Sequence, residues 1–199
     1  MTTLAPAAHV KSSADPLQLI DVDHVRFYVG NAKQAAFFYA NCFGFQIDQV
    51  SDLTSGSRDA AHYLLTQGNI RFLLTSGLSA EHPASMDCAL YGDGVKDVAF
   101  TVFDAEAAYT RAVKNGGTSA YEPKTFKDEH GTIVMAGIKT YGRAQHSFVS
   151  RHGAYDLPKV KAGGLFAPSF RRMGPLAVND FNAKSPRGLK YVDHLVGNI

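Results

Sequence analysis

Cysteine is scarce in this sequence, with Cys42 and Cys88 as its two examples among 199 residues. Two cysteines so far apart form neither a metal-binding spacing nor a disulfide framework. Such a composition is typical of proteins kept in a reducing compartment. We therefore expect a cytoplasmic location.

The sequence also has a small net charge and few long apolar runs. The formal net charge is +2, and no block of Lys and Arg alternates with aromatic residues, so nucleic acid is not an expected partner. The N-terminus has no basic start followed by a sustained apolar run, so we expect neither a signal peptide nor a membrane span. Residues 1–19 are expected to form a flexible arm. The hydrophobic content of 45% is typical of a globular protein.

Residues 22–31 predict a strand that leads directly into a helix. Val25, Phe27 and Val29 alternate with more polar residues, which is the period of a strand buried on one face. A shortened copy of this stretch returns at residues 192–198 and repeats its Asp-His pair. A histidine repeated near the start of two strands is a candidate metal ligand.

The helix that follows carries signals at both ends. Asn31 is a typical N-cap, Gln34 stands in the capping-box position, and Gly44 is a typical C-terminal cap. An apolar stripe at helical spacing is expected to face the core, and it comprises Ala35, Phe38, Tyr39 and Cys42. Burial of Phe38 would contribute about 2 kcal/mol to stability, so we expect Phe38→Asp to unfold this unit. Because Cys42 lies on the same stripe, we expect it to be a buried, inert thiol.

The order strand-helix-strand-strand-strand occurs twice. The first unit is expected to carry strands near residues 22–29, 45–53, 61–66 and 70–74. The second is expected to begin with a strand, to continue with a helix capped by Asp104, and to place its strands near residues 95–103, 118–126, 132–140 and 144–151. Two such βαβββ modules predict an α+β fold in which a curved mixed sheet forms a cup with the helices outside.

The domain organisation follows from these modules. Residues 20–152 are expected to form one domain, with modules at about 20–78 and 93–152. Residues 153–188 show no sustained period and contain repeated Pro and Gly, so we expect a linker. Residues 189–199 predict the first strand of an incomplete C-terminal domain. The basic residues of the linker are interpreted as solvated surface rather than as a polyanion site, and they are Lys159, Lys161, Arg171 and Arg172.

Four motifs occur together in the order and at the spacing of one known family. They lie at residues 29–45, 92–100, 139–142 and 193–198. On these motifs the chain resembles the N-terminal half of the 4-hydroxyphenylpyruvate dioxygenase family, together with the start of the C-terminal half. The family is part of the vicinal oxygen chelate superfamily, and the resemblance implies that fold. It also implies, for the intact enzyme, non-haem Fe(II), a 2-oxo acid and O2 as substrates, and homo-oligomeric assembly. The implied reaction converts 4-hydroxyphenylpyruvate and O2 to homogentisate and CO2 in tyrosine catabolism.

The resemblance also implies the metal ligands. The family holds Fe(II) through two histidines and one glutamate of its C-terminal half, which leaves open positions for the keto acid and O2. His194 matches the first of these ligands, and the other two are expected beyond Ile199. The chain alone, truncated or naturally short, is therefore expected to bind Fe(II) weakly and to have no dioxygenase turnover.

His24 occupies the corresponding position in the first module. Alignment of the modules places Asp97 at the second ligand position and Ser147 at the glutamate position. His146 is next to Ser147 but points to the opposite face of the strand. Because His24 and Asp97 alone make a poor metal site, we expect His24 to be a hydrogen-bonded structural residue. Four further histidines lie in surface-like or turn contexts and are not expected to have a chemical role: His62, His82, His130 and His152.

Three alternatives stay open. The intact protein could be a hydroxymandelate synthase, which uses the same substrate and iron but hydroxylates the benzylic carbon. The chain could be a non-catalytic binding or assembly module whose sheet holds a small apolar acid. It could also be a small metal-dependent lyase or dioxygenase that uses His24.

Overall fold

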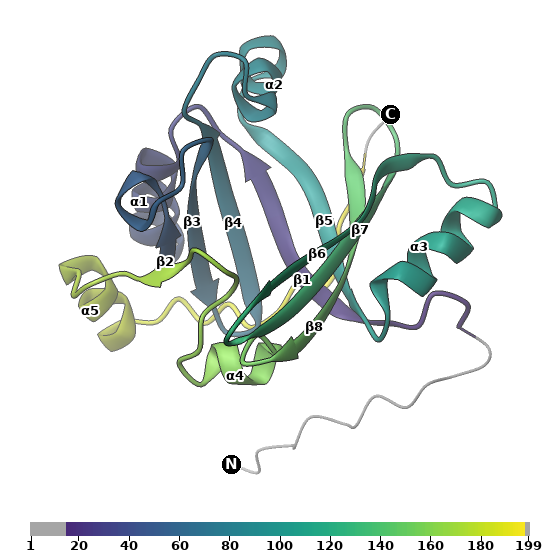
Figure 1. Cartoon of the computed structure of the whole chain (residues 1–199). Helices are drawn as coiled ribbons and strands as arrows, with labels where there is room; N and C mark the ends of the chain where they lie inside the picture. Colours follow the sequence, from purple (N-terminus) through teal and green to yellow (C-terminus); the bar gives the residue numbers. More distant parts are fainter. Residues whose placement is uncertain (1–14, 198–199) are drawn as a thin grey trace.

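A single curled sheet organises the molecule. The computed structural model describes residues 15–197. Their nine strands form one sheet in the order β6-β7-β8-β5-β1-β4-β3-β2-β9, and the longer helices lie on its outer side (Figure 1). Within the described part of the chain, no helix is long and apolar enough to cross a membrane.

Each predicted module is present with its elements in the expected order. The first module consists of β1 (Leu19–Tyr28), α1 (Ala32–Phe43), β2 (Gln46–Ser51), β3 (Ala60–Gln67) and β4 (Ile70–Gly77), with a short 3-10 helix η1 (Leu53–Ser55) after β2. The second module consists of β5 (Gly94–Val102), α3 (Ala105–Lys114), β6 (Ser119–Asp128), β7 (Gly131–Lys139) and β8 (Gln145–Gly153). The additional elements are α2 (Pro83–Tyr91), α4 (Leu157–Lys161), β9 (Arg171–Arg172) and α5 (Ala177–Lys184).

The two modules meet at the centre of the sheet. There β1 pairs with β5 in antiparallel register, while β1 runs parallel to β4 and β5 runs parallel to β8. Each module thus contributes four adjacent strands, one pair of which is parallel. The predicted α+β fold with a curved mixed sheet and outer helices is confirmed.

Helix α1 has the predicted ends, but the predicted apolar stripe is only half correct, because Ala35 and Tyr39 pack against the core whereas Phe38 and Cys42 do not. The side chain of Asn31 accepts a hydrogen bond from the backbone N–H of Gln34 at 3.0 Å, and Gly44 adopts φ 80° at the C-terminal cap. The residues that pack on the sheet are Ala32, Ala36 and Ala40, because their small side chains allow the helix to approach the strands closely. The side chain of Phe38 is 55% exposed, and Cys42 is exposed as well. The predictions of a buried Phe38 and a buried Cys42 are therefore wrong.

The segment between the two predicted modules contains an additional helix, α2. The side chain of His82 caps α2 by accepting a hydrogen bond from the N–H of Ala84, and Pro83 occupies the first helical turn. Proline is tolerated in a first turn, where its missing N–H would have no intrahelical partner. Pro83 is therefore compatible with the helix that follows it.

Residues 153–188 are more structured than the expected linker. Tyr155, Val160 and Phe166 are buried against the inner face of the sheet. Strand β9 pairs with β2, and Asn182 of α5 donates hydrogen bonds to the carbonyls of Ala40 and Phe45. These anchors are single residues at irregular spacing, so no periodic pattern announces them. The predicted domain boundaries themselves stay a prediction.

The last described segment, residues 189–197, differs from the prediction. Residues 189–197 were expected to form a strand, but they take no regular secondary structure. Their backbone accepts a hydrogen bond from the N–H of Asn69 at the carbonyl of Lys190, and the N–H of Leu189 donates to Oε1 of Gln67 at 3.1 Å. A strand requires a continuous paired neighbour, and this segment has none among the described residues. Residues 1–14 of the predicted N-terminal arm, and residues 198–199, lie outside the described range.

Candidate functional site on the inner face of the sheet

The centre of the inner face is formed by β1, β5 and β8. Alternate residues of β1 point outward, where Phe27 and Val29 pack with α1. The side chain of His24 points inward, and its ring contacts that of Phe166 edge-on at a centroid distance of 5.4 Å. A shift in the pairing of β1 with β5 between Val22 and His24 bends the strand locally. This shift allows the adjacent residues Asp23 and His24 to share one buried environment.

Asp23 is the centre of a buried ionic network. Its carboxylate accepts hydrogen bonds from Nε and Nη2 of Arg151 at 2.7 and 2.8 Å and from Oγ1 of Thr101 at 3.1 Å. Its backbone carbonyl accepts from the guanidinium of Arg71. Burial opposes the charge of Asp23, but the Arg151 guanidinium and the hydrogen bonds from His24 and Arg151 hold the pKa of Asp23 well below its usual range. The carboxylate is therefore ionised at neutral pH.

The imidazole of His24 is held in one tautomer by this carboxylate. Its Nδ1 lies 2.7 Å from Oδ1 of Asp23, and burial lowers the pKa of His24 despite that contact. A neutral ring beside an ionised acceptor carries its proton on Nδ1, which leaves a lone pair on Nε2. Nε2 is buried and has no hydrogen-bond partner among the described residues. The orientation of His24 is that of a metal-binding histidine whose second nitrogen is fixed by a carboxylate.

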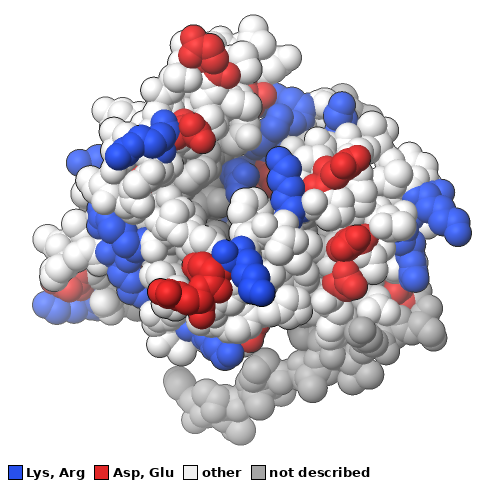
Figure 2. Space-filling view, viewed as in Figure 1, with Lys and Arg blue, Asp and Glu red and all other residues white. Residues whose placement is uncertain are grey.

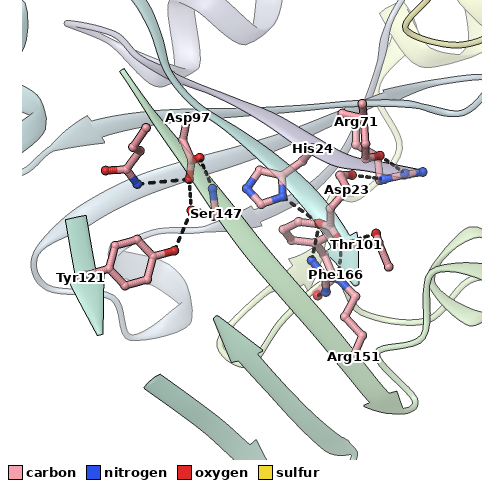
Figure 3. A network of polar contacts seen from close by, with 11 residues as sticks. Asp23, His24, Arg71, Asp97, Thr101, Tyr121, Ser147, Arg151 and Phe166 are labelled. Carbon is pink, nitrogen blue, oxygen red and sulfur yellow. Dashed lines mark hydrogen bonds and ion pairs between the residues drawn. The ribbon is translucent and has the colours of Figure 1, made fainter. Parts of the chain in front are cut away.

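A second polar cluster lies beside His24. Oδ1 of Asp97 accepts a hydrogen bond from the backbone N–H of Ser147 at 3.0 Å, and Oδ2 accepts from Oγ of Ser147 and from Nε2 of Gln145. The hydroxyl of Tyr121 lies 2.6 Å from Oγ of Ser147. Burial and the Asp97 charge raise the pKa of Tyr121 to about 12. Figure 3 shows His24 between this cluster and the Asp23 network.

The structure thus brings together the three positions that module alignment assigned to metal ligands. The strand register places Ala99 beside both His24 and Ser147, and it places Asp97 beside Gln145 on the same sheet. The residues present do not fit an Fe(II) site of two histidines and one carboxylate. Both oxygens of Asp97 are engaged by β8, serine is not a family ligand, and no group of three His, Cys, Asp or Glu in residues 15–197 could hold a metal ion.

His146 does not complete the set. Its ring faces the outer side of the sheet, with Nδ1 3.2 Å from the carbonyl of Val98 and the ring 5.2 Å from that of Phe100. This outward position of His146 agrees with the prediction that His146 and Ser147 point to opposite faces of the sheet. A metal site on the inner face would require different residues at the ligand positions, because no rotamer of His146 places its ring on that face.

Two further polar groups lie on the inner face, where the sequence predicted neither of them. Arg26 is the cross-strand neighbour of Asp97, yet Asp97 is turned toward β8, and Nε of Arg26 has no hydrogen-bond partner among the described residues. Nδ1 of His62 lies 3.0 Å from Oγ1 of Thr75, and burial together with the Arg26 charge lowers the pKa of His62 to about 3. The surface-like context expected for His62 is wrong. Successive side chains of a strand point to opposite faces, and Tyr63 packs in the core with α1. This alternation could have indicated that His62 points to the inner face.

Figure 2 shows that the face of the molecule seen in Figure 1 is hollowed between its two halves, with Lys and Arg side chains at the wall of the hollow.

His194 lies apart from this inner face. The side chain is exposed, and its Nδ1 lies 2.9 Å from Oδ2 of Asp193, so the repeated Asp-His pair makes the same contact in both copies. The C-terminal segment lines a cavity of about 540 Å³ with the outer face of β5 and β8, including Phe100 and His146. The role of His194 as an iron ligand stays a prediction, because the described residues around it supply no further ligands.

Comparison with known proteins identifies the family. Residues 21–142 match the family model described as the Glyoxalase/Bleomycin resistance protein/Dioxygenase superfamily. The chain belongs to this superfamily. Among solved structures, the fold of this superfamily member is similar to that of a 4-hydroxymandelate synthase mutant from Streptomyces coelicolor. The TM-score is 0.62, and the sequence identity is 22% over 67% of this chain and 39% of that chain. It is also similar to methylmalonyl-CoA epimerase from Mycobacterium tuberculosis, with a TM-score of 0.57 and 19% identity over 78% of this chain and 98% of that chain.

Curated relatives within the superfamily are similar over most of the chain. The 4-hydroxyphenylpyruvate dioxygenase of Dictyostelium discoideum is 40% identical over 88% of this chain and 46% of its own length. That of Tetrahymena thermophila is 38% identical over 91% of this chain and 44% of its own length. The chain therefore spans a little less than half the length of these relatives.

Proposed function

We propose that this chain is the N-terminal part of a non-haem Fe(II) dioxygenase that converts 4-hydroxyphenylpyruvate and O2 to homogentisate and CO2. The observation that carries the proposal is the 38–40% identity to enzymes of that name over about nine-tenths of the chain. The sequence resemblance, which runs from residue 29 to residue 198, supports the same assignment. Homo-oligomeric assembly and a cytoplasmic location are proposed for the intact enzyme on the same basis.

The chain's own residues have structural roles in this proposal. The inner face of the first two modules has the ligand orientation at His24 but replaces the remaining ligands with the hydrogen-bonded pair Asp97 and Ser147. We assign this face to the support of the fold. The Fe(II) would be held by His194 together with a histidine and a glutamate from the part of the enzyme that this chain does not cover, and it would bind the keto acid and activate O2.

The reading frame downstream of the codon for Ile199 provides the test. We expect it to continue through two more βαβββ modules that supply one histidine and one glutamate. The protein expressed from the whole frame should form homogentisate from 4-hydroxyphenylpyruvate, and His194→Ala should lower kcat at least about a hundredfold by removing a metal ligand. His152→Ala, which changes an exposed histidine of β8, is the matched control and should retain activity.

The other outcomes discriminate between the alternatives. Hydroxymandelate as the product would replace the proposed reaction with that of a hydroxymandelate synthase. O2 consumption that depends on 4-hydroxyphenylpyruvate in the purified 199-residue chain would show that the described residues carry the activity, contrary to the proposal. A frame that ends at Ile199 would favour a non-catalytic binding or assembly module.

A further inference from the structure

A cavity of about 310 Å³ lies between the first module and the segment that follows the second module. The sheet side of its wall includes Asp48 and Arg71, and the other side includes Lys161 of α4 and Arg172 of β9. This volume is at the lower end of the range for small-molecule sites in proteins. The cavity is separate from the inner-face cluster of His24 and Asp97, and its interpretation does not depend on the proposed dioxygenase function.

The positive charge of this cavity is only partly neutralised within the described residues. Arg172 forms an ion pair with Asp48. Arg71 donates instead to the backbone carbonyls of Val22 and Asp23, and Nζ of Lys161 donates to the amide oxygen of Asn69 at 2.8 Å. Arg71 and Lys161 thus have neutral hydrogen-bond partners. Three cations and one carboxylate leave the wall with a formal charge of +2.

Partial burial makes the charge of Arg71 costly. Burial lowers the pKa of Arg71 although the charges of Asp23 and Asp21 oppose this shift, and the carboxylate of Asp23 is already paired with Arg151. A cation that has lost part of its hydration gains from an anion brought into contact with it. Lys161 faces the same cavity from the opposite wall, so an anion between them would meet two cations from different segments.

Hydrogen bonds to the backbone of β2 hold the wall in place. The N–H of Met173 donates to the carbonyl of Asp48 at 2.9 Å, and the side chain of Asn179 bonds both the N–H and the carbonyl of Ile47 at 2.9 Å each. These contacts fix the segment after β8 against β2. The cavity is therefore formed by ordered elements and not by mobile surface side chains alone.

We propose that this cavity is a binding site for a small anion with at least two acidic groups, held between Arg71 and Lys161. The basic residues Lys161 and Arg172, which the sequence pattern indicated to be solvated surface, belong to the wall of this site. The acidic groups can be phosphates or carboxylates, because both accept hydrogen bonds from guanidinium and ammonium groups.

Calorimetric titration of the 199-residue chain at low ionic strength tests the proposal. Pyrophosphate and citrate are titrated separately, and at least one of them should bind with a Kd below about 1 mM. Lys161→Glu should weaken binding at least about tenfold, because it replaces a contacting cation with an anion. Lys161 is exposed, so this variant is expected to fold.

Lys159→Glu is the matched control, because Lys159 lies on the same helix but bonds the carbonyl of Gly153 and does not line the cavity. It should change the Kd by less than about twofold. Binding of pyrophosphate alone would indicate a phosphate-bearing ligand, and binding of citrate alone a polycarboxylate. Absence of binding by both anions, or an equal loss in Lys159→Glu, would overturn the proposal.

Discussion

The two Asp-His pairs show how one local contact can have two different surroundings. In both pairs the aspartate carboxylate contacts Nδ1 of the following histidine, at 2.7 Å for His24 and 2.9 Å for His194. The first pair is buried beneath Phe166 and bound by Arg151, whereas the second pair is exposed. The contact itself depends on neighbours in the sequence, but the chemical use of Nε2 depends on residues far away in the sequence.

Phe38 provides a test of residue-scale packing on α1. Its side chain is 55% exposed, whereas Ala36 on the same helix is 0% exposed. We expect Phe38→Asp to lower the free energy of unfolding by less than about 1 kcal/mol, because the new carboxylate stays in water. Ala36→Asp should cost at least about 3 kcal/mol, because it places a charge between helix and sheet.

Guanidinium chloride unfolding followed by circular dichroism measures both changes. If Phe38→Asp proves as destabilising as Ala36→Asp, the assigned buried face of α1 is incorrect.

At the scale of elements, the segment after β8 is part of the fold of the first module. The carbonyl of Phe166 accepts a hydrogen bond from Nη1 of Arg151 at 2.6 Å, and its N–H donates to Oε1 of Gln49 at 2.8 Å. The segment therefore links strands of both modules across the inner face. It closes part of the cup and contributes a wall to the anion cavity proposed above.

Phe166→Ala should show how much this segment stabilises the domain. The Phe166 ring is buried and packs against His24 and the Arg151 guanidinium, whose centre lies 4.3 Å from the ring centroid. We expect a loss of about 3–4 kcal/mol in the free energy of unfolding, from lost burial and lost cation–π contact. Phe181→Ala in α5, where the side chain is 54% exposed, should cost less than about 1 kcal/mol.

Denaturant titration of the two variants makes the comparison. Equal, small losses would mean that residues 153–188 do not contribute to the stability of the domain.

At the scale of the whole molecule, buried histidines make stability dependent on pH. Burial lowers the pKa of both His24 and His62, the latter to about 3, from an ordinary value of 6.5. Below 6.5 the unfolded chain binds more protons than the folded chain, so stability falls as the pH falls. The lowered pKa of Asp23 acts in the same direction but only below its ordinary value of 3.8.

We expect about 2–4 kcal/mol of stability to be lost between about pH 7 and pH 5, about 2 kcal/mol of it from His62, before the carboxylates contribute. Unfolding midpoints in guanidinium chloride across this range measure the loss. His62→Asn should flatten the dependence, because asparagine has no titrating group but can still hydrogen-bond Thr75. His152→Asn at an exposed position should leave the dependence unchanged, and a wild-type profile without slope would contradict the assignment.

The sequence alone determined the order of elements within each βαβββ module, the duplication of that module, and the caps of α1 and α3. Asn31, Gly44 and Asp104 act on backbone groups within a few residues of themselves, so their effects can be read locally. The same holds for the Gly68-Asn69 turn that joins β3 to β4.

Only the tertiary structure decided which face of α1 is buried, how residues 153–188 pack, and which polar groups meet. The approach of His24 to Asp97 and Ser147 requires the register of three strands, and the cavity of Arg71 and Lys161 requires the return of a distant segment. Such contacts are made between residues far apart in sequence. Their energies depend on the close packing of the whole sheet, which no local period records.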